Sequence, residues 1–153
     1  NFLDGAAHFY DTYECSDNKY IAVGSIESQF YNILLDKLEL SDPRFENQMD
    51  QSMWKELKEI IATKIKSQSR DHWVEIFSDT DGCVTPVLNM EEAQEHEHNV
   101  SRESFVNLEG FNQPAPAPRF SNDILSIKHN AKEIGSDIDD ICDEFNLDKE
   151  AFS

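Results

Sequence analysis

One carboxylate, Glu27, stands where it could take part in proton chemistry. In the residues up to Ile26, polar and apolar side chains alternate as in a strand, and after Glu27 the apolar residues recur at helical spacing. A helix N-terminus favours the ionised carboxylate, which can orient a neighbouring imidazole and stabilise imidazolium. From spacing alone, however, Glu27 is most simply an acid at a helix start, gaining about 0.3–1 kcal/mol from the helix dipole.

Three histidines, the pair His96 and His98 and the single His8, could also suggest chemistry. His96 and His98 flank Glu97 in an acidic stretch, but histidines two apart suit a strand-borne metal site and no third ligand stands at an expected spacing. We therefore expect a solvated acidic loop and no metal. His8 lies alone near the start of a strand, and we expect it to be hydrogen-bonded locally rather than to act as a base.

The remaining motifs argue against two enzyme classes. Ser25 and Ser28 lie near Glu27, but the chain has no Gly-x-Ser-x-Gly elbow, so we do not expect a serine hydrolase. Only five glycines are present and none forms a phosphate-binding loop, so a nucleotide enzyme is not expected either.

Composition limits the partners. The 153 residues carry a formal net charge of −18, which repels phosphate backbones, so we expect no nucleic-acid partner. No apolar run approaches the roughly 20 residues of a membrane span, and we expect none. Three widely separated cysteines, Cys15, Cys83 and Cys142, fit neither a disulfide framework nor a metal site and indicate a reducing compartment.

The elements that would position Glu27 follow from hydrophobic spacing. Polar and apolar residues alternate over 9–26 on both sides of a polar turn at 16–19, which predicts a hairpin. A helix over 28–39 should place Phe30, Leu34 and Leu38 on one apolar face, with Ile33 beside them. The further predicted elements are a helix over 52–67 with Trp54, Leu57, Ile61 and Ile65 buried, a helix capped by Ser69 with Trp73 and Phe77 one turn apart, a buried strand over 83–88, a helix over 90–95 and a strand over 104–108.

The composition changes after residue 112. Residues 113–119 contain alternating proline and alanine, flanked by Gln113 and Arg119, and predict a semi-rigid spacer. In the acidic tail, Ser136 and Asp139 resemble a capping box, and the apolar stripe of the helix would be Ile134, Ile138, Ile141 and Phe145. A lone helix of this kind needs a surface on which to dock.

The predicted fold class is α+β. A short antiparallel sheet, made of the N-terminal hairpin and one or two further strands, would pack against three or four helices. The predicted division is a small domain over residues 1–110, a Pro/Ala linker over 111–121 and an acidic helical tail over 122–153.

Several segments carry a resemblance to a known family. They are Leu3-Asp4-Gly5, Phe9-Tyr10, Ala22-Val23-Gly24, Ile26-Glu27 and Gln29-Phe30-Tyr31. Together they resemble the small domain of the α-methylacyl-CoA racemases, a branch of the class III CoA-transferase family. The resemblance continues to about Phe120.

The resemblance implies a C-terminal fragment that is inactive alone. The whole enzyme would interconvert (R)- and (S)-2-methylacyl-CoA thioesters through an enolate. Glu27 would pair with a histidine of the large domain, and Phe9, Tyr10 and Ile26 would line the substrate pocket. No cofactor is implied beyond the coenzyme A of the substrate. Because this chain is so acidic, the groups that hold the coenzyme A phosphates should mostly lie on a partner or on the missing domain.

The implied assembly is an interlocked homodimer, with the acidic tail docked on the large domain. Its location would be a peroxisome or mitochondrion in a eukaryote and the cytoplasm in a bacterium. The chain departs from the family pattern at His8 and Ser28, where proline is usual, and at Gly82, where alanine is usual; the change at His8 suggests a more mobile loop. The alternatives are a class III CoA-transferase and a non-catalytic dimerisation module.

Overall fold

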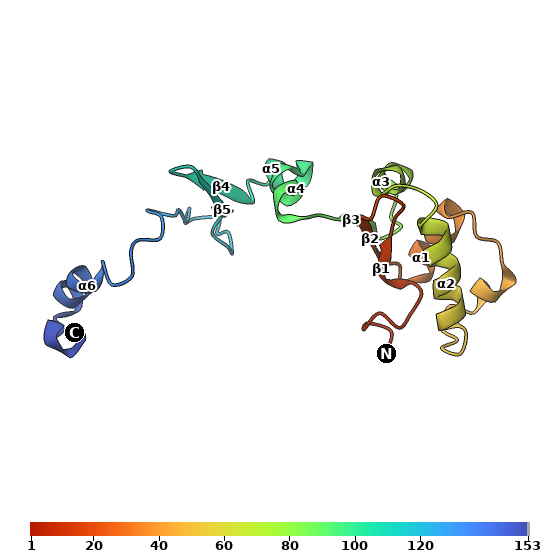
Figure 1. The fold of residues 1–153 in the computed structure, drawn as a ribbon, viewed down its shortest axis with the longest axis horizontal. Coiled ribbons are helices and arrows are strands. Elements are labelled where there is room, and N and C mark those ends of the chain that lie inside the picture. The colour runs from red at the N-terminus through yellow and green to blue at the C-terminus, as the bar shows by residue number, and fades with distance from the viewer. Residues whose placement is uncertain (153) are drawn as a thin grey trace. The chain divides into compact units, whose positions relative to one another are not determined.

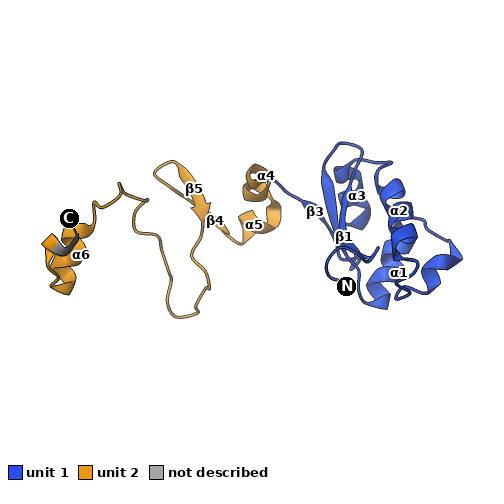
Figure 2. Ribbon diagram, turned by 60° about the horizontal axis from the view of Figure 1, so that its bottom comes forward, with its two compact units in different colours: residues 1–89 blue, residues 90–153 orange. Residues whose placement is uncertain are grey.

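The computed structural model describes residues 1–152. They form two compact units, unit 1 over residues 1–89 and unit 2 from Met90 onward (Figures 1 and 2). The elements of unit 1 are β1 (Tyr10–Glu14), β2 (Tyr20–Gly24), α1 (Ser28–Lys37), the 3-10 helix η1 (Pro43–Glu46), α2 (Trp54–Ile65), α3 (Arg70–Phe77) and β3 (Val84–Val87). The predicted α+β class is therefore confirmed.

The sheet of unit 1 is antiparallel, in the order β1-β2-β3. The predicted hairpin is confirmed, with Tyr10 opposite Gly24 in its register. The predicted strand over 83–88 is confirmed as β3, but the prediction that this strand is buried was wrong. In β3, Val84 and Pro86 face the same side as the core residues of β2 and are only half-buried because the sheet ends at this strand, whereas Thr85 and Val87 face the other side and are exposed. Pro86, which has no N–H to donate, pairs with Ile21 in this strand.

One face of the sheet packs against the helices. Tyr13, Ile21 and Val23 from the strands join the buried core cluster with residues of α1, α2 and α3. The predicted stripe of α2 is confirmed, since all four of its residues are buried: Trp54, Leu57, Ile61 and Ile65. The spacing of three and four residues places them on one helical face.

The predicted face of α1 was partly wrong. Leu34 and Leu38 are buried as expected, but the third buried residue is Tyr31, and Phe30 is only half-buried. Tyr31 faces the core because its hydroxyl group has a buried hydrogen-bonding partner there, His8.

The start of α3 agrees with the prediction. The Ser69 side chain accepts a hydrogen bond from the backbone N–H of His72 at 3.3 Å, which satisfies one free donor of the helix N-terminus. Trp73 and Phe77 are buried one turn apart. The indole Nε1 of Trp73 donates to the Ile65 carbonyl at 2.8 Å and so connects α3 to the end of α2.

Unit 2 contains shorter elements. They are α4 (Met90–Glu95), α5 (Glu97–Ser101), β4 (Phe105–Leu108), β5 (Phe111–Pro114), α6 (Ile138–Phe145) and the 3-10 helix η2 (Lys149–Phe152). The predicted helix over 90–95 and strand over 104–108 are confirmed. β5 pairs with β4, so the predicted spacer begins as a strand. The predicted acidic loop around His96 is instead the start of α5, where His96 Nδ1 accepts a hydrogen bond from the His98 N–H at 3.3 Å.

The start of α6 also differs from the prediction. Asp137, not Ser136, is the N-cap, and it makes no side-chain capping bond. A backbone turn at Gly135, with φ of +82°, precedes the helix and takes the place of the predicted capping box. The predicted apolar stripe is exposed, and its members are Ile134, Ile138, Ile141 and Phe145. The division into residues 1–110, 111–121 and 122–153 stays a prediction.

The described residues include no helix with both the length and the hydropathy that a membrane crossing requires.

Candidate functional site

The candidate site lies at the junction where β2 ends at Gly24 and α1 begins at Ser28. Glu27 is the N-cap residue of α1, with extended backbone angles of φ −73° and ψ 144°, and its side chain makes no capping hydrogen bond. It is exposed, and no residue in the range 1–152 forms an ion pair with it. The carboxylate is therefore not engaged by its own helix, and it can accept a hydrogen bond from another group.

Hydrogen bonds from two directions hold this junction. Gln48, in the loop after η1, donates from Nε2 to the carbonyl oxygens of Ser25 at 3.1 Å and Ile26 at 2.9 Å. The buried Ser25 hydroxyl donates to the Gly82 carbonyl at 2.6 Å, which ties the junction to the segment before β3. Neither contact was predicted from the sequence. Each contact joins residues more than 20 positions apart, so no local sequence signal pointed to it.

The pKa of the Cys83 thiol depends in part on the negative charge of Glu27. The pKa of this exposed thiol is raised by partial burial first, and then by the negative charges of Glu27 and Asp81. The Cys83 carbonyl accepts a hydrogen bond from the Gly24 N–H at 2.9 Å, so residue 83 lies beside the end of β2. The thiol is consequently protonated at neutral pH, which makes it a weak nucleophile.

A cavity of about 480 Å³ opens beside Tyr10, Gly24 and Cys83. Tyr10 lies close over Gly24, since a Cβ at that glycine would be 3.8 Å from Tyr10 Cε2. The other lining residues are Leu3, Asp4, Gly5, Asp11, Thr12, Ala22, Val23 and Thr85. Several of them are small, and the two carboxylates are unsuited to binding a phosphate group.

Lys58 of α2 fixes one wall of this cavity. Its Nζ donates to the Gly5 carbonyl at 2.5 Å and pairs with the Asp11 carboxylate. The N-terminal loop is therefore held to both β1 and α2, so the cavity is partly preformed.

The predicted substrate-binding residues lie in different surroundings. Tyr10 is half-buried and lines the cavity. Ile26 is half-buried at the junction and packs against the core. Phe9 is fully buried, with its ring centroid 5.7 Å from that of Trp54, so it supports the site from within the core. Their contact with substrate stays a prediction.

His8 is a core residue with no exposed surface. Its Nε2 lies 2.7 Å from the Tyr31 hydroxyl, and Nδ1 has no hydrogen-bond partner. With the proton on Nε2, His8 donates to the Tyr31 hydroxyl, which in turn donates to the Phe45 carbonyl at 3.3 Å. The group left without a partner is then the lone pair on Nδ1, which needs no acceptor. Burial lowers the pKa of His8 to about 4, so it is neutral near pH 7.

The burial of His8 bears on its predicted role. The expectation of a hydrogen-bonded imidazole holds, but the partner is 23 residues away rather than local. The side chain is packed in the core instead of lying in a mobile loop, and it has no surface through which it could act as a base on a substrate.

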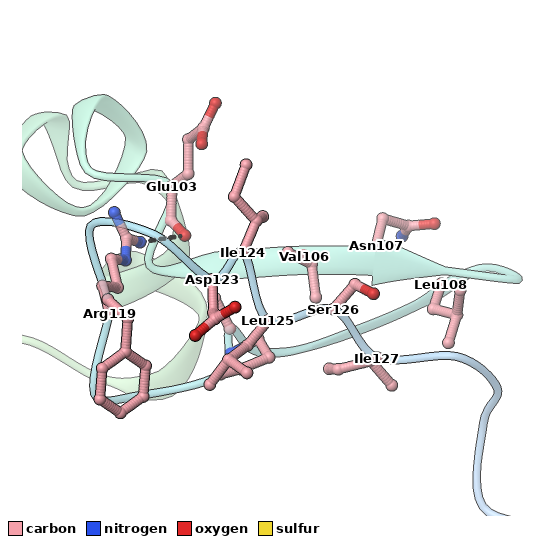
Figure 3. Close-up of a pocket in the computed structure, with 13 residues that line it drawn as sticks. Glu103, Val106, Asn107, Leu108, Arg119, Asp123, Ile124, Leu125, Ser126 and Ile127 are labelled. Carbon is pink, nitrogen blue, oxygen red and sulfur yellow. Dashed lines mark hydrogen bonds between the residues drawn. The ribbon is translucent and has the colours of Figure 1, made fainter.

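A second cavity, of about 370 Å³, lies within unit 2 between β4 and residues 115–127 (Figure 3). Its lining is mostly aliphatic and includes Val106, Ile124 and Ile127. The Arg119 guanidinium turns toward the backbone of Glu103 and donates to its carbonyl at 2.8 Å. This cavity is suited to apolar contact rather than to proton transfer.

Within residues 1–152, no group of three or more His, Cys, Asp or Glu side chains is arranged so that it could hold a metal ion.

Comparisons with known proteins bear on both fold and site. The family model for CoA-transferase family III matches residues 2–137. The chain is 40% identical to human α-methylacyl-CoA racemase over 153 residues, covering 98% of this chain and 40% of the relative. It is 44% identical to the mouse racemase over 118 residues, covering 77% of this chain and 31% of the relative.

Two further matches are more distant. A CaiB/baiF CoA-transferase family protein of Caenorhabditis elegans is 32% identical over 119 residues, covering 76% of this chain and 33% of the relative. The chain thus spans 40% or less of the length of these curated relatives. The crystal structure of a mutant of Rv3272 from Mycobacterium tuberculosis superposes with a TM-score of 0.61 at 13% identity, covering 76% of this chain and 35% of that one, and so shares its fold.

Proposed function

This chain belongs to CoA-transferase family III, and from that premise we propose that it is the C-terminal part of an α-methylacyl-CoA racemase. The observation that carries the proposal is the 40% identity with the human racemase over nearly the whole chain. A second racemase, from mouse, is 44% identical.

The reaction would invert the carbon next to a thioester. The proton on that carbon is weakly acidic; one group removes it to give an enolate, and a second group returns a proton to the opposite face. Hydrogen-bond donors near the thioester oxygen would stabilise the enolate. The groups that transfer the proton would lie outside this chain, so the chain alone would be inactive.

Glu27 would support that chemistry by pairing with a histidine of the large domain. A carboxylate that accepts a hydrogen bond from one imidazole nitrogen fixes the tautomer and stabilises imidazolium. The exposed Glu27 side chain, which does not cap its own helix, has the acceptor capacity for this role. Tyr10 and Ile26 would contact the acyl group, with Phe9 supporting them from the core.

The substrate class follows from the same proposal. It is a 2-methylacyl-CoA thioester, with no cofactor beyond its own coenzyme A. The net charge of −18 suggests that the coenzyme A phosphates are held mostly by residues outside this chain. We further propose an interlocked homodimer, located in a peroxisome or mitochondrion, given that the racemase relatives are human and mouse proteins.

The test is α-deuterium uptake by the full-length protein. A single enantiomer of a 2-methylacyl-CoA is incubated in heavy water, and deuterium incorporation and loss of chirality are followed. Wild type should show both. Glu27→Gln keeps the size of the side chain but removes its charge, and it should lower kcat by about 10²-fold or more. No uptake by wild type would refute the proposal.

A class III CoA-transferase is the second candidate, because the family model and the nematode relative carry that name. It would move coenzyme A from the thioester to a free carboxylic acid without inverting the α-carbon. Adding a free acid to the same assay distinguishes the two reactions.

A further inference from the structure

We propose that Gln48 is a positioning residue that holds Glu27 at the junction between β2 and α1. The inference rests on the proposed function, because it concerns how the Glu27 carboxylate is presented to the reaction.

Gln48 acts on the peptide that leads into Glu27. Its Nε2 donates to two consecutive carbonyl oxygens, those of Ser25 at 3.1 Å and Ile26 at 2.9 Å. The Ile26 carbonyl lies in the same planar peptide unit as the Glu27 nitrogen. Fixing that oxygen therefore fixes the direction in which the chain enters Glu27.

The junction needs such a donor. The two carbonyls lie between the last residue of β2, Gly24, and the first residue of α1, Ser28. They are therefore outside the regular hydrogen bonding of strand and helix and need partners from elsewhere. Both are bound by one half-buried side chain, Gln48.

Gln48 is itself anchored to the core. Its backbone carbonyl accepts a hydrogen bond from Nε1 of Trp54 at 2.8 Å. Trp54 is buried and packs edge-on against Phe9. Movement of the junction relative to the core would thus break contacts that Gln48 makes on both sides.

Ser25 has a different role at the junction. Its hydroxyl ties the junction to Gly82 at 2.6 Å, but that contact does not involve the peptide between Ile26 and Glu27. Among the side-chain hydrogen bonds of the described residues, the one from Gln48 Nε2 to the Ile26 carbonyl is the one that reaches that peptide.

The kinetic test uses the full-length protein. Gln48→Met removes the amide donor at similar size, and Gln51→Met makes the same change at an exposed position three residues along. Gln48→Met should lower kcat for α-deuterium uptake by about tenfold with KM within about twofold, because a misplaced group mainly affects the transition state. Gln51→Met should leave both values unchanged, and equal effects of the two variants would overturn the inference.

A double-mutant cycle separates positioning from a general structural role. If Gln48 acts through Glu27, then Gln48→Met in a Glu27→Gln background should lower kcat by less than about twofold. A general loss of structure would lower kcat by the same factor in both backgrounds, and that result would contradict the inference.

A third readout does not need activity. Partial burial and, after it, the charge of Glu27 raise the pKa of the Cys83 thiol, so displacement of Glu27 should lower that pKa. The pH profile of Cys83 alkylation by iodoacetamide, followed by peptide mass spectrometry, should shift in Gln48→Met toward that of Glu27→Gln. An unchanged profile would overturn the inference. If wild type shows no deuterium uptake, the proposed racemase activity is wrong, and the Cys83 profile still decides whether Gln48 positions Glu27.

Discussion

Replacing His8 with glutamine should remove an acid-sensitive part of the stability of unit 1. The His8 imidazole is fully buried, and burial lowers its pKa from 6.5 to about 4. In the unfolded chain the ring takes up a proton below about pH 6.5, whereas in the folded chain it stays neutral until about pH 4. The unfolded state therefore binds more protons in that interval, and stability falls as the pH falls through it.

The size of the effect follows from the shift. A lowering of the His8 pKa from 6.5 to about 4 corresponds to roughly 3 kcal/mol of unfolding free energy, present above pH 6.5 and lost by about pH 4. His8→Gln cannot titrate and keeps an amide donor for the Tyr31 hydroxyl. The difference in unfolding free energy between wild type and His8→Gln should therefore shrink by roughly 3 kcal/mol between pH 7 and pH 4.

The assay is urea unfolding of the 153-residue chain, followed by tryptophan fluorescence. Both tryptophans, Trp54 and Trp73, are buried in unit 1, so the signal reports on the unit that contains His8. His72→Gln makes the same change at an exposed position, so it is the matched control and should alter the unfolding free energy at pH 7 by less than about 0.5 kcal/mol. If the difference in unfolding free energy between wild type and His8→Gln stays constant within about 0.5 kcal/mol from pH 7 to pH 4, the reasoning is refuted. If His8→Gln does not fold, an NMR titration of the wild-type His8 ring gives the same answer, since it should show no protonation above pH 5.

Three further results are expected. Tyr31→Phe should lower the unfolding free energy by about 1–3 kcal/mol, because it removes the partner of His8 Nε2 inside the core; urea unfolding measures this. Ser69→Ala should lower the unfolding free energy by about 1 kcal/mol in the same assay, because α3 loses the side chain that caps its N-terminus. Iodoacetamide at pH 8 should alkylate the exposed Cys83 at least roughly tenfold faster than Cys15, which is buried and whose pKa is raised to about 11; peptide mass spectrometry measures both rates.

Matched controls are available for the first two of these results. Tyr10→Phe removes a hydroxyl group from a half-buried tyrosine, and Ser16→Ala changes an exposed serine, so each should alter stability by less than about 0.5 kcal/mol. Equal losses in a variant and its control would contradict the assigned contact. For the thiols, similar alkylation rates in the folded chain would show that Cys15 is not protected as the structure indicates.

Local patterns predicted most of unit 1. The stripe of α2 was correct because Leu57, Ile61 and Ile65 repeat at helical spacing, and burial of that face follows directly. The start of α3 was correct because Ser69 precedes the helix and its hydroxyl has a local backbone partner. These features depend on residues close together in the sequence.

The errors arose where distant residues decide the outcome. Tyr31 replaced Phe30 in the core because its partner, His8, is 23 residues away. The exposure of β3 depends on how many strands the sheet contains, which no single segment encodes. At the candidate site, too, local features could be predicted and distant contacts could not. The position of Glu27 at a strand-to-helix junction follows from local spacing. The contacts of Gln48 span 22 and 23 residues and were found only in the structure.

Pro86 affects how the sheet of unit 1 can associate with other chains. The Gly24 N–H bonds to the Cys83 carbonyl, and the alternation of an antiparallel ladder then turns residue 86 toward the outer side of β3. The donor that proline lacks is consequently missing from the free edge rather than from the pairing with β2. A strand from another molecule would find an interrupted row of donors there, so β3 is protected against intermolecular strand addition and the aggregation that follows from it.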